Sequence, residues 1–374
     1  MNAQSGSSAA YSQKTQQFLQ QLILQKLGIQ YPIFLAPMAG TSTPELAAAV
    51  SNAGGLGSLG LATATVDGVR QAIQKTRQLT DKPFNCNFFC HQPPQHDPAT
   101  EQVWIDYMRP HFETLGATPP STLKPVNYSL VNNPALLEVL LEEKPAVVSF
   151  HFGLPEPEAI QQLQQAGIIL LATATSLAEA QRIEQAGLDG IVAQGVEAGG
   201  HRGIFNRDFD PAIGMLDLLR LLKAHTNLPI IATGGIMDGH AIRQVLEQGA
   251  CAAQLGTAFV ICAESAAEPM YRQRLQDPNY QTTHITASIS GRPARGLMSA
   301  WHTQIDQPER PALTSYSYTY DLAKQLHAVA AKKGNYDFAA YWAGSNVTQI
   351  RALNATELMH TLIVELQATA RLEA

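Results

Sequence analysis

Short apolar runs alternate with amphipathic stretches over most of the chain, and this pattern predicts its architecture. Most runs begin or end at Gly or Pro and are followed by a stretch with helical spacing, which is the rhythm of parallel strands joined by helical crossovers. The eight runs are residues 32–38, 55–60, 83–89, 146–152, 167–173, 190–194, 229–234 and 252–257. Because eight such strands can close on themselves, the sequence predicts an α/β fold of the (β/α)8 TIM-barrel type.

Capping signals support helices between these runs. Thr43 is followed by Pro and Glu, Ser176 opens a Ser-Leu-Ala-Glu capping box, and Asp238 precedes a segment that stops at a Gln-Gly pair. These are residue types that accept hydrogen bonds from the free N–H groups of a first helical turn. We expect helices to begin at all three positions.

Two stretches break the strand and helix rhythm. Residues 90–134 hold eight prolines, which predicts a long loop after the third strand with only a short helix around Trp104. Residues 266–334 are rich in Tyr and contain Pro, which predicts a smaller lid-like subdomain after the eighth strand. The expected organisation is a flexible tail at 1–17, a barrel at 18–265 plus 335–374 ending in a helix at about 356–370, and the lid at 266–334.

An open, doubly wound sheet is the alternative architecture. It predicts a Gly-x-Gly-x-x-Gly segment after the first strand, and the sequence has none there. The glycines at 54–60 lie at the second run, where they favour tight turns and close packing over phosphate binding. The barrel is therefore the preferred prediction.

Composition narrows the class of protein. The 374 residues carry 25 Lys and Arg against 31 Asp and Glu, a net charge of −6, with no basic run, which argues against nucleic acid as a partner. Four cysteines in so long a chain indicate a reducing compartment rather than a disulfide scaffold. The first residues do not resemble a secretory signal and no run is long enough to span a membrane. We expect a cytoplasmic protein, either a monomer or a homodimer.

Glycine-rich segments end the seventh and eighth runs. The sequences Thr-Gly-Gly-Ile from residue 233 and Gln-Leu-Gly-Thr from residue 254 fall where many barrels bind a phosphate. Glycines let backbone N–H groups approach phosphate oxygens without a Cβ in the way. Glycines that merely close loops are the alternative reading of both segments.

The sixth run ends in the most polar segment of the chain. Residues 194–203 read Gln-Gly-Val-Glu-Ala-Gly-Gly-His-Arg-Gly, and so many polar groups in a barrel mouth favour a bound ligand. His201 is the side chain there that can exchange a proton near neutral pH, which makes it the candidate catalytic base, although an isolated histidine is often structural. His151, at the end of the fourth run, is a second candidate on equal terms with a structural role.

Two further segments have the character of a ring-binding site. Ala36, Pro37 and Met38 form an apolar strand end suited to one face of a planar ring, and Asn87 has an amide that can donate to or accept from its polar edge. No metal is expected, because the Cys and His residues at 86–96 match no zinc spacing. Cys262 has no adjacent base and is expected to be a packed thiol.

Five motifs, taken in order, resemble the nitronate monooxygenase family, formerly called 2-nitropropane dioxygenase, and its class I members in particular. They are Ala36-Pro-Met-Ala-Gly, Gln194-Gly-Val-Glu-Ala-Gly-Gly-His, Thr233-Gly-Gly-Ile, Gln254-Leu-Gly-Thr-Ala-Phe and Ser290-Gly-Arg-Pro-Ala-Arg-Gly. The segment Tyr341-Trp-Ala-Gly is also similar to a closing segment of that family. The resemblance covers most of the chain from about residue 26 and implies an FMN-containing barrel.

The resemblance also implies roles for particular residues. Its FMN contacts fall on Asn87, Gln194, Gly199, Gly235, Gln254, Leu255, Gly256 and Thr257. The ring-wall and glycine arguments add Ala36, Pro37, Met38, Gly200 and Gly234 to the expected cofactor site. The catalytic histidine falls on His201, and Tyr316, Tyr320 and Lys324, spaced four apart, resemble the substrate-side residues. Pro110-His-Phe stands where many members have Pro-Tyr-Tyr, which puts the size of the substrate in question.

The implied reaction is the oxidation of an alkyl nitronate, such as propionate 3-nitronate, by O2 to a carbonyl compound and nitrite through a flavin semiquinone. His201 is the base when a neutral nitroalkane is bound. The alternative is an NAD(P)H-dependent flavin reductase acting on quinones or enoyl thioesters, since Ala-Gly-Gly-His also occurs in such enzymes. A non-catalytic flavin- or phosphate-binding barrel is a third possibility, and it leaves His201 and Lys324 without a purpose.

Overall fold

The computed structural model describes residues 22–368, so the predicted tail at 1–17 lies outside the described residues. Eight parallel strands pair in the order β1-β9-β8-β6-β5-β4-β3-β2. They are β1 (Ile33–Leu35), β2 (Gly57–Gly60), β3 (Phe84–Phe89), β4 (Val147–His151), β5 (Ile169–Ala174), β6 (Gly190–Gln194), β8 (Ile230–Thr233) and β9 (Ala252–Leu255). A parallel bridge from Phe34 to Leu56 joins the two ends of this sheet, and Leu35 N donates to Leu56 O at 2.9 Å. The predicted (β/α)8 barrel is therefore confirmed.

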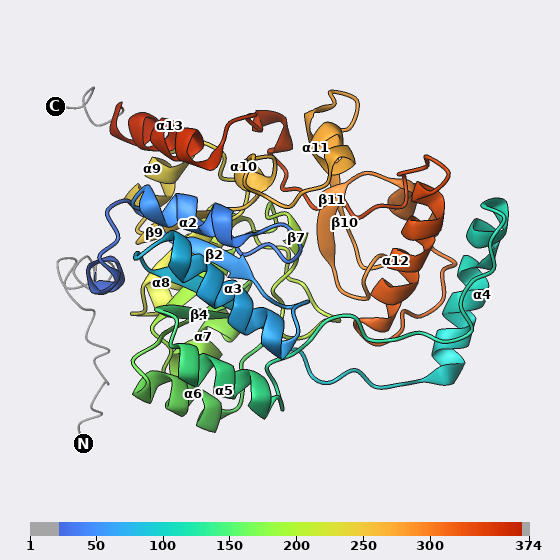
Figure 1. The fold of residues 1–374 in the computed structure, drawn as a ribbon, viewed down its shortest axis with the longest axis horizontal. Helices are drawn as coiled ribbons and strands as arrows, with labels where there is room; N and C mark the ends of the chain where they lie inside the picture. The colour runs from blue at the N-terminus through green and yellow to red at the C-terminus, as the bar shows by residue number, and fades with distance from the viewer. Residues whose placement is uncertain (1–21, 369–374) are drawn as a thin grey trace, which may run out of the picture.

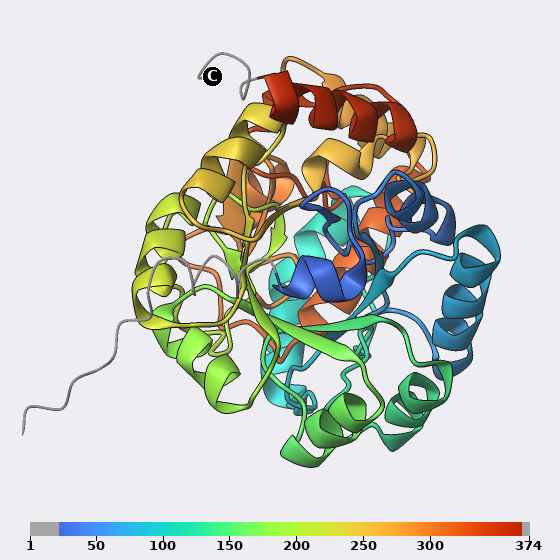
Figure 2. The same ribbon diagram turned by 90° about the vertical axis from the view of Figure 1, so that its left-hand side faces the viewer.

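Helices surround the barrel in a ring, as the end-on view in Figure 2 shows. They are α2 (Pro44–Asn52), α3 (Val66–Leu79), α5 (Pro134–Glu143), α6 (Pro157–Gln165), α7 (Leu177–Gln185), α8 (Met215–His225), α9 (Gly239–Glu247) and α13 (Ala355–Ala368). The three predicted caps are confirmed, because Thr43, Ser176 and Asp238 accept hydrogen bonds from backbone N–H groups of α2, α7 and α9. No helix within residues 22–368 has the length and apolar character needed to cross a membrane.

The main hydrophobic core lies between the strands and this ring of helices. Close approach of α2 to β2 depends on a residue without a side chain, since a Cβ at Gly57 would lie 1.9 Å from Ala47 O. This contact supports the packing interpretation of the glycines at 54–60.

A second hydrophobic cluster lies outside the barrel. It joins α4 (Pro98–Thr114), the π-helical segment Trp301–Ile305 and α12 (Tyr318–Ala331), and Figure 1 shows α4 beside α12 at the side of the molecule opposite the termini. Trp104, Met108 and Phe112 of α4 are buried in this cluster. The part of the structure outside the barrel thus includes α4, which belongs to the connection after β3. The limits of the lid subdomain at residues 266 and 334 remain a prediction.

The prediction of only a short helix around Trp104 was wrong, because α4 has 17 residues. Two of its prolines do not prevent the helix. Asp97 caps it and Pro98 occupies its first turn, where no N–H is needed, and Pro110 lies in the last turn but one. The apolar face of α4 is buried against α12, and that tertiary packing offsets the cost of an interior proline.

A small antiparallel sheet connects the two parts. Its order is β10 (Thr283–Thr286), β11 (Ala294–Leu297) and β7 (Gly200–His201), with His201 opposite Ala294 and Gly200 opposite Arg295. The candidate histidine is therefore held on a two-residue strand by a segment almost one hundred residues away in the sequence.

Also beyond the barrel ring are the short helix α10 (Thr257–Val260), which directly follows β9, and α11 (Pro269–Gln276). A 3₁₀ turn, Val347–Gln349, precedes α13. The predicted final helix corresponds to α13 over its described part.

Candidate active site

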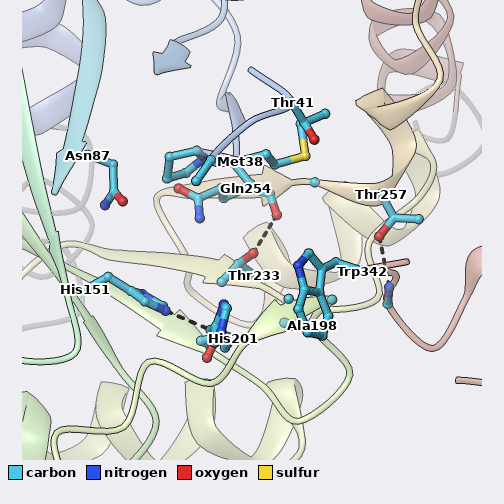
Figure 3. Close-up of a pocket in the computed structure, with 18 of the residues that line it drawn as sticks. Met38, Thr41, Asn87, His151, Ala198, His201, Thr233, Gln254, Thr257 and Trp342 are labelled. Carbon is cyan, nitrogen blue, oxygen red and sulfur yellow. Dashed lines mark hydrogen bonds between the residues drawn. The ribbon is translucent and has the colours of Figure 1, made fainter. Parts of the chain in front are cut away.

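A cavity of about 400 Å³ opens at the carboxyl ends of the barrel strands. Its wall contains residues from or just after β1, β3, β4, β6, β8 and β9, including Met38, Asn87, His151, Thr233 and Gln254 (Figure 3). Small-molecule sites occupy roughly 300–1,000 Å³, and barrel enzymes place them at this end. The location and size are those of an enzyme active site.

Most of the predicted site residues meet in this cavity. Those that line it are Ala36, Pro37, Met38, Asn87, Gln194, Gly199, Gly200, His201, Gly234, Gly235, Gln254, Gly256, Thr257, Tyr320 and Lys324. Two do not line it. Leu255 belongs to β9 and its side chain is buried in the barrel core, while the Tyr316 ring is buried with its centre 5.9 Å from that of His201.

Glycines form one end of the cavity, where β8 and β9 stop. Gly234 and Gly235 have φ angles of +129° and +70°, which favour glycine, and Asn346 Nδ2 donates to Gly235 O at 2.6 Å. The hydroxyl of Thr257 accepts from Gly344 N at 2.9 Å and so joins this end to the chain at 342–344. The backbone here is fixed in position without side chains that would fill the space.

Asn87 has only part of its amide available to a ligand. Its Nδ2 donates to Ser149 O at 3.1 Å and lies 2.9 Å from Ser149 Oγ. The sequence predicted that this amide could donate to or accept from a ligand. Because Nδ2 already has protein partners, the carbonyl oxygen is the atom left to accept a hydrogen bond from a ligand.

The Gln194 amide serves the loop that carries His201. Its Nε2 donates to His201 O at 3.0 Å, and its Oε1 accepts from Gly203 N at 2.7 Å and Arg202 Nη1 at 3.1 Å. The side chain thus holds the backbone from the His201 carbonyl to the Gly203 amide, and its predicted contact with FMN remains a prediction.

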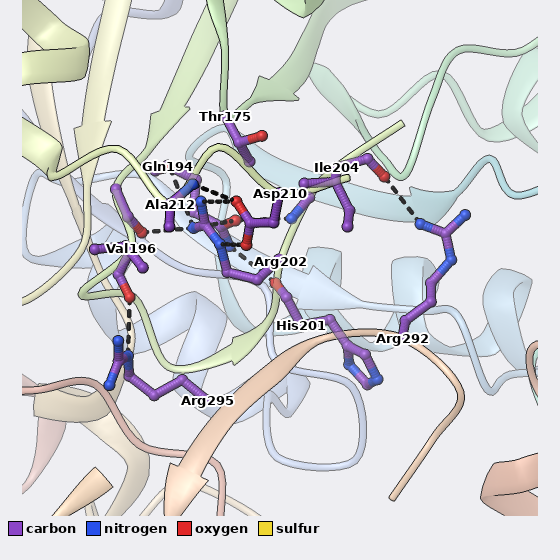
Figure 4. A network of polar contacts seen from close by, with 12 residues as sticks. Thr175, Gln194, Val196, His201, Arg202, Ile204, Asp210, Ala212, Arg292 and Arg295 are labelled. Atoms are coloured by element: carbon purple, nitrogen blue, oxygen red, sulfur yellow. Dashed lines mark hydrogen bonds and ion pairs between the residues drawn. The ribbon is translucent and has the colours of Figure 1, made fainter. Parts of the chain in front are cut away.

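Arg202 stabilises the same loop, which spans residues 194–203, through the network drawn in Figure 4. Its side chain is fully buried, with Nε 2.7 Å from Asp210 Oδ2 and Nη1 donating to Gly195 O at 2.7 Å. Asp210 supplies the opposite charge that a buried guanidinium needs. Sequence reading did not single out Asp210, which follows the motif by several residues.

The His201 ring is oriented by a buried hydroxyl. Its Nε2 lies 2.8 Å from Ser290 Oγ, and Ser290 Oγ lies 3.1 Å from Arg292 O. A hydroxyl that donates to that carbonyl accepts from Nε2–H of the imidazole, and this arrangement leaves Nδ1 as the nitrogen with a free lone pair. Burial, with a contribution from His151 and Arg292, lowers the pKa of His201 to about 3, so the ring is neutral at physiological pH.

His151 lies beside His201 and supports its backbone. Its Nε2 lies 3.3 Å from His201 O and its Nδ1 lies 3.0 Å from Thr173 Oγ1, while burial lowers its pKa to about 3. Both ring nitrogens have protein partners, which favours a supporting role over proton exchange with a ligand.

Helix α12 contributes Tyr320 and Lys324 to the cavity wall. Lys324 Nζ lies 4.8 Å from the centre of the Tyr320 ring, and no carboxylate of the described chain lies within 4 Å of it. Burial lowers the pKa of Lys324. The amine therefore faces the cavity as a cation without an ion pair.

Several lining residues were missed in the sequence. Asn127, Phe89 and Trp342 line the cavity, and the Trp342 ring centre is 5.2 Å from that of His201. Trp342 falls in a segment that the resemblance singled out, whereas nothing local marked Asn127. His111 and Phe112 are not among the lining residues, since Phe112 is buried in the second cluster and His111 packs on Phe338.

The barrel and the buried histidine at its mouth define an enzyme of the TIM-barrel class. Comparison with known proteins specifies it further, because the nitronate monooxygenase family profile matches residues 20–365. Nitronate monooxygenases from Paraburkholderia phytofirmans and Pseudomonas aeruginosa are each 51% identical to this chain, over 94% and 91% of it and 97% of their own lengths. The solved structure of nitroalkane oxidase from Streptomyces ansochromogenes superposes with a TM-score of 0.85 at 38% identity, covering 94% of this chain and all of that one.

The chain belongs to the nitronate monooxygenase family. It is an oxidoreductase, and the family supports the oxidation of nitronates as its activity.

Proposed function

We propose that this enzyme binds FMN and uses O2 to oxidise alkyl nitronates, such as propionate 3-nitronate, to carbonyl compounds and nitrite. The observation that carries the proposal is a neutral, oriented imidazole beside a glycine-lined cavity at the strand ends. FMN, when bound, supplies the electron acceptor that none of the twenty side chains provides.

Several groups of the cavity support FMN as the cofactor. Gly234, Gly235 and Gly256 would offer backbone N–H groups to the phosphate, since no Cβ blocks that end of the cavity. Pro37 and Met38 would supply the apolar surface for a ring face, and Asn87 Oδ1 an acceptor for a ring N–H.

His201 is assigned the proton transfer. With Nε2–H committed to Ser290, the Nδ1 lone pair accepts the proton from the carbon beside the nitro group of a neutral nitroalkane. A nitronate arrives without that proton, so the same ring then acts as a polar contact. Tyr320 and Lys324 line the same cavity, where the ammonium group would hold the anionic oxygens. The rings of Tyr316 and Tyr320 both pack beside that of His201.

Purified enzyme loaded with FMN tests this proposal. Adding ethyl nitronate in air is expected to consume O2 and release nitrite and acetaldehyde, with no nicotinamide present. The cofactor released by heating is expected to have the mass of FMN. Protein that binds no flavin, or that releases no nitrite, contradicts the proposal.

Replacing Ser290 by Ala is expected to lower kcat/KM for nitroethane about fivefold while changing that for ethyl nitronate about twofold or less, because one oriented hydrogen bond contributes about 1 kcal/mol. The reason is that His201 loses the partner that keeps Nδ1 free. Initial rates of O2 uptake measure both substrates.

Ser288→Ala is the matched control, since Ser288 is also fully buried but its hydroxyl donates to Asp306 at 2.8 Å, away from the histidine. Equal losses on both substrates in Ser290→Ala would show that the hydroxyl does not act through proton transfer.

A further inference from the structure

Arg292 is a buried cation that forms no ion pair within the described residues. Arg292 is only 6% exposed. Its Nη1 donates to Ile204 O at 2.9 Å, whereas its Nε has no hydrogen-bond partner among the described residues. No carboxylate oxygen of the described chain lies within 4 Å of its guanidinium, in contrast to Arg202 beside Asp210 (Figure 4). Such a charge is costly to bury, so a function is the better explanation of its presence.

Two carboxylates, those of Glu179 and Asp208, interact electrostatically with Arg292, but neither forms an ion pair with it. Glu179 accepts hydrogen bonds from Thr175 N, Thr175 Oγ1 and Phe205 N. Asp208 is an exposed side chain 3.4 Å from Arg207. Burial lowers the pKa of Arg292 to about 10, which still leaves the guanidinium charged at neutral pH.

One layer of aromatic side chains separates this cation from the active site. The guanidinium carbon lies 4.3 Å from the centre of the Phe152 ring and 5.7 Å from that of Tyr316. The Phe152 ring centre in turn lies 5.7 Å from that of His201. Aromatic rings do not cancel a charge, so its field reaches the cavity through a medium that contains little water.

The remaining groups on this inner wall are neutral. Burial, together with the charge of Arg292, lowers the pKa of His91 to about 4 and those of His151 and His201 to about 3. Tyr316 and Tyr320 have pKa values raised by burial, and Arg202 is paired with Asp210. Arg292 is thus a cation without an ion pair behind this wall, and among the lining residues within 22–368 Lys324 is the cation without an ion pair.

We propose that Arg292 is an electrostatic positioning residue that selects anionic substrates, drawing a nitronate toward His201 in preference to the neutral nitroalkane. This rests on the proposed function, because it names which protonation state of the substrate the same site prefers. Arg292 does not touch the substrate but acts through its field across Phe152 and Tyr316.

The test compares Arg292→Gln and Arg292→Lys with wild-type enzyme at one pH. A unit charge removed at this separation, in surroundings of intermediate dielectric constant, is expected to raise the KM for ethyl nitronate about tenfold and the KM for nitroethane less than about twofold. Arg292→Lys keeps a cation in the same place when the pH is below the lowered pKa of a buried lysine. Under that condition it is expected to stay within about threefold of wild type for both substrates. Thermal unfolding of each variant shows whether it folds, and Arg292→Met serves as a second neutral variant.

Arg207→Met is the matched control, because it removes the same charge from a more exposed side chain that pairs with Asp208. It is expected to leave both KM values unchanged. If Arg292→Gln raises both KM values equally, or if Arg207→Met has the same effect, the proposal is wrong.

Calorimetric titration with nitrate, a planar anion, tests whether Arg292 favours anion binding independently of whether the enzyme oxidises nitronates. Arg292→Gln is expected to bind nitrate about tenfold more weakly than wild type, whether or not the enzyme oxidises nitronates. Unchanged nitrate binding contradicts the role of Arg292. An enzyme that binds nitrate through Arg292 but oxidises no nitronate contradicts only the proposed function.

Discussion

Replacing His201 by Asn is expected to lower kcat/KM for nitroethane by about 10²–10⁴-fold, the contribution of a positioned general base, and to affect ethyl nitronate far less. The neutral nitroalkane must lose a proton at the ring that Ser290 orients, whereas the nitronate has already lost it. The variant is expected to remain yellow, since the FMN contacts proposed for Pro37, Met38, Asn87, Gly234, Gly235 and Gly256 come from other strand ends and are not changed. Stopped-flow or O2-electrode rates with both forms of the substrate measure the ratio.

His111→Asn is the control for this variant, because His111 is a partly buried histidine of α4 that does not line the cavity. It is expected to leave both rates within about twofold of wild type, because substitutions away from the active site and from buried polar networks usually have small effects. Equal losses on nitroethane and ethyl nitronate in His201→Asn would remove the base role and leave His201 as a binding residue.

Replacing Gly256 by Val is expected to abolish FMN binding while leaving the fold intact. The φ of Gly256 is −110°, so a side chain there causes no backbone strain, and its Cβ would lie 3.4 Å from Ala36 Cβ and 3.9 Å from Met38 Sδ. The two further methyl groups of Val would enter the space proposed for the cofactor. The measurement is the ratio of flavin to protein absorbance after purification in excess FMN, with circular dichroism to verify the fold.

Gly256→Ala provides the graded comparison, because its single methyl group makes only ordinary contacts with Ala36 and Met38. It is expected to retain most of the bound FMN. Full FMN occupancy in Gly256→Val would place the cofactor elsewhere in the cavity.

Local signals in the sequence were sufficient for the barrel. Each of the eight predicted runs overlaps a strand, and β6 has the predicted limits, whereas β5 extends one residue past its run. Helix starts at Thr43, Ser176 and Asp238 were equally visible, because a cap is encoded within four residues of its helix. Strand ends in a parallel barrel meet at one edge, so the order of the motifs alone brought most of the predicted site residues together.

Features that depend on distant contacts were not visible. The length of α4 depends on burial against α12, and the strand that holds His201 forms only because Ala294 lies opposite it. Asp210 and Asn127 enter the site region from loops without a local signature. The lack of an ion pair at Arg292 is apparent only in the folded chain, where no carboxylate oxygen of residues 22–368 lies within 4 Å of its guanidinium. The prediction for Leu255 followed its motif neighbours, whereas its position in β9 directs the side chain into the core.

Anaerobic mixing of the FMN-loaded enzyme tests the central claim most directly. Ethyl nitronate in one cell and NADH or NADPH in another are added without O2, and the visible absorbance of the flavin is followed. We expect the nitronate alone to reduce the flavin, and we expect the oxidised spectrum to return with release of nitrite when air is admitted. Reduction by the nicotinamide alone would contradict this expectation and would identify the enzyme as an NAD(P)H-dependent flavin reductase.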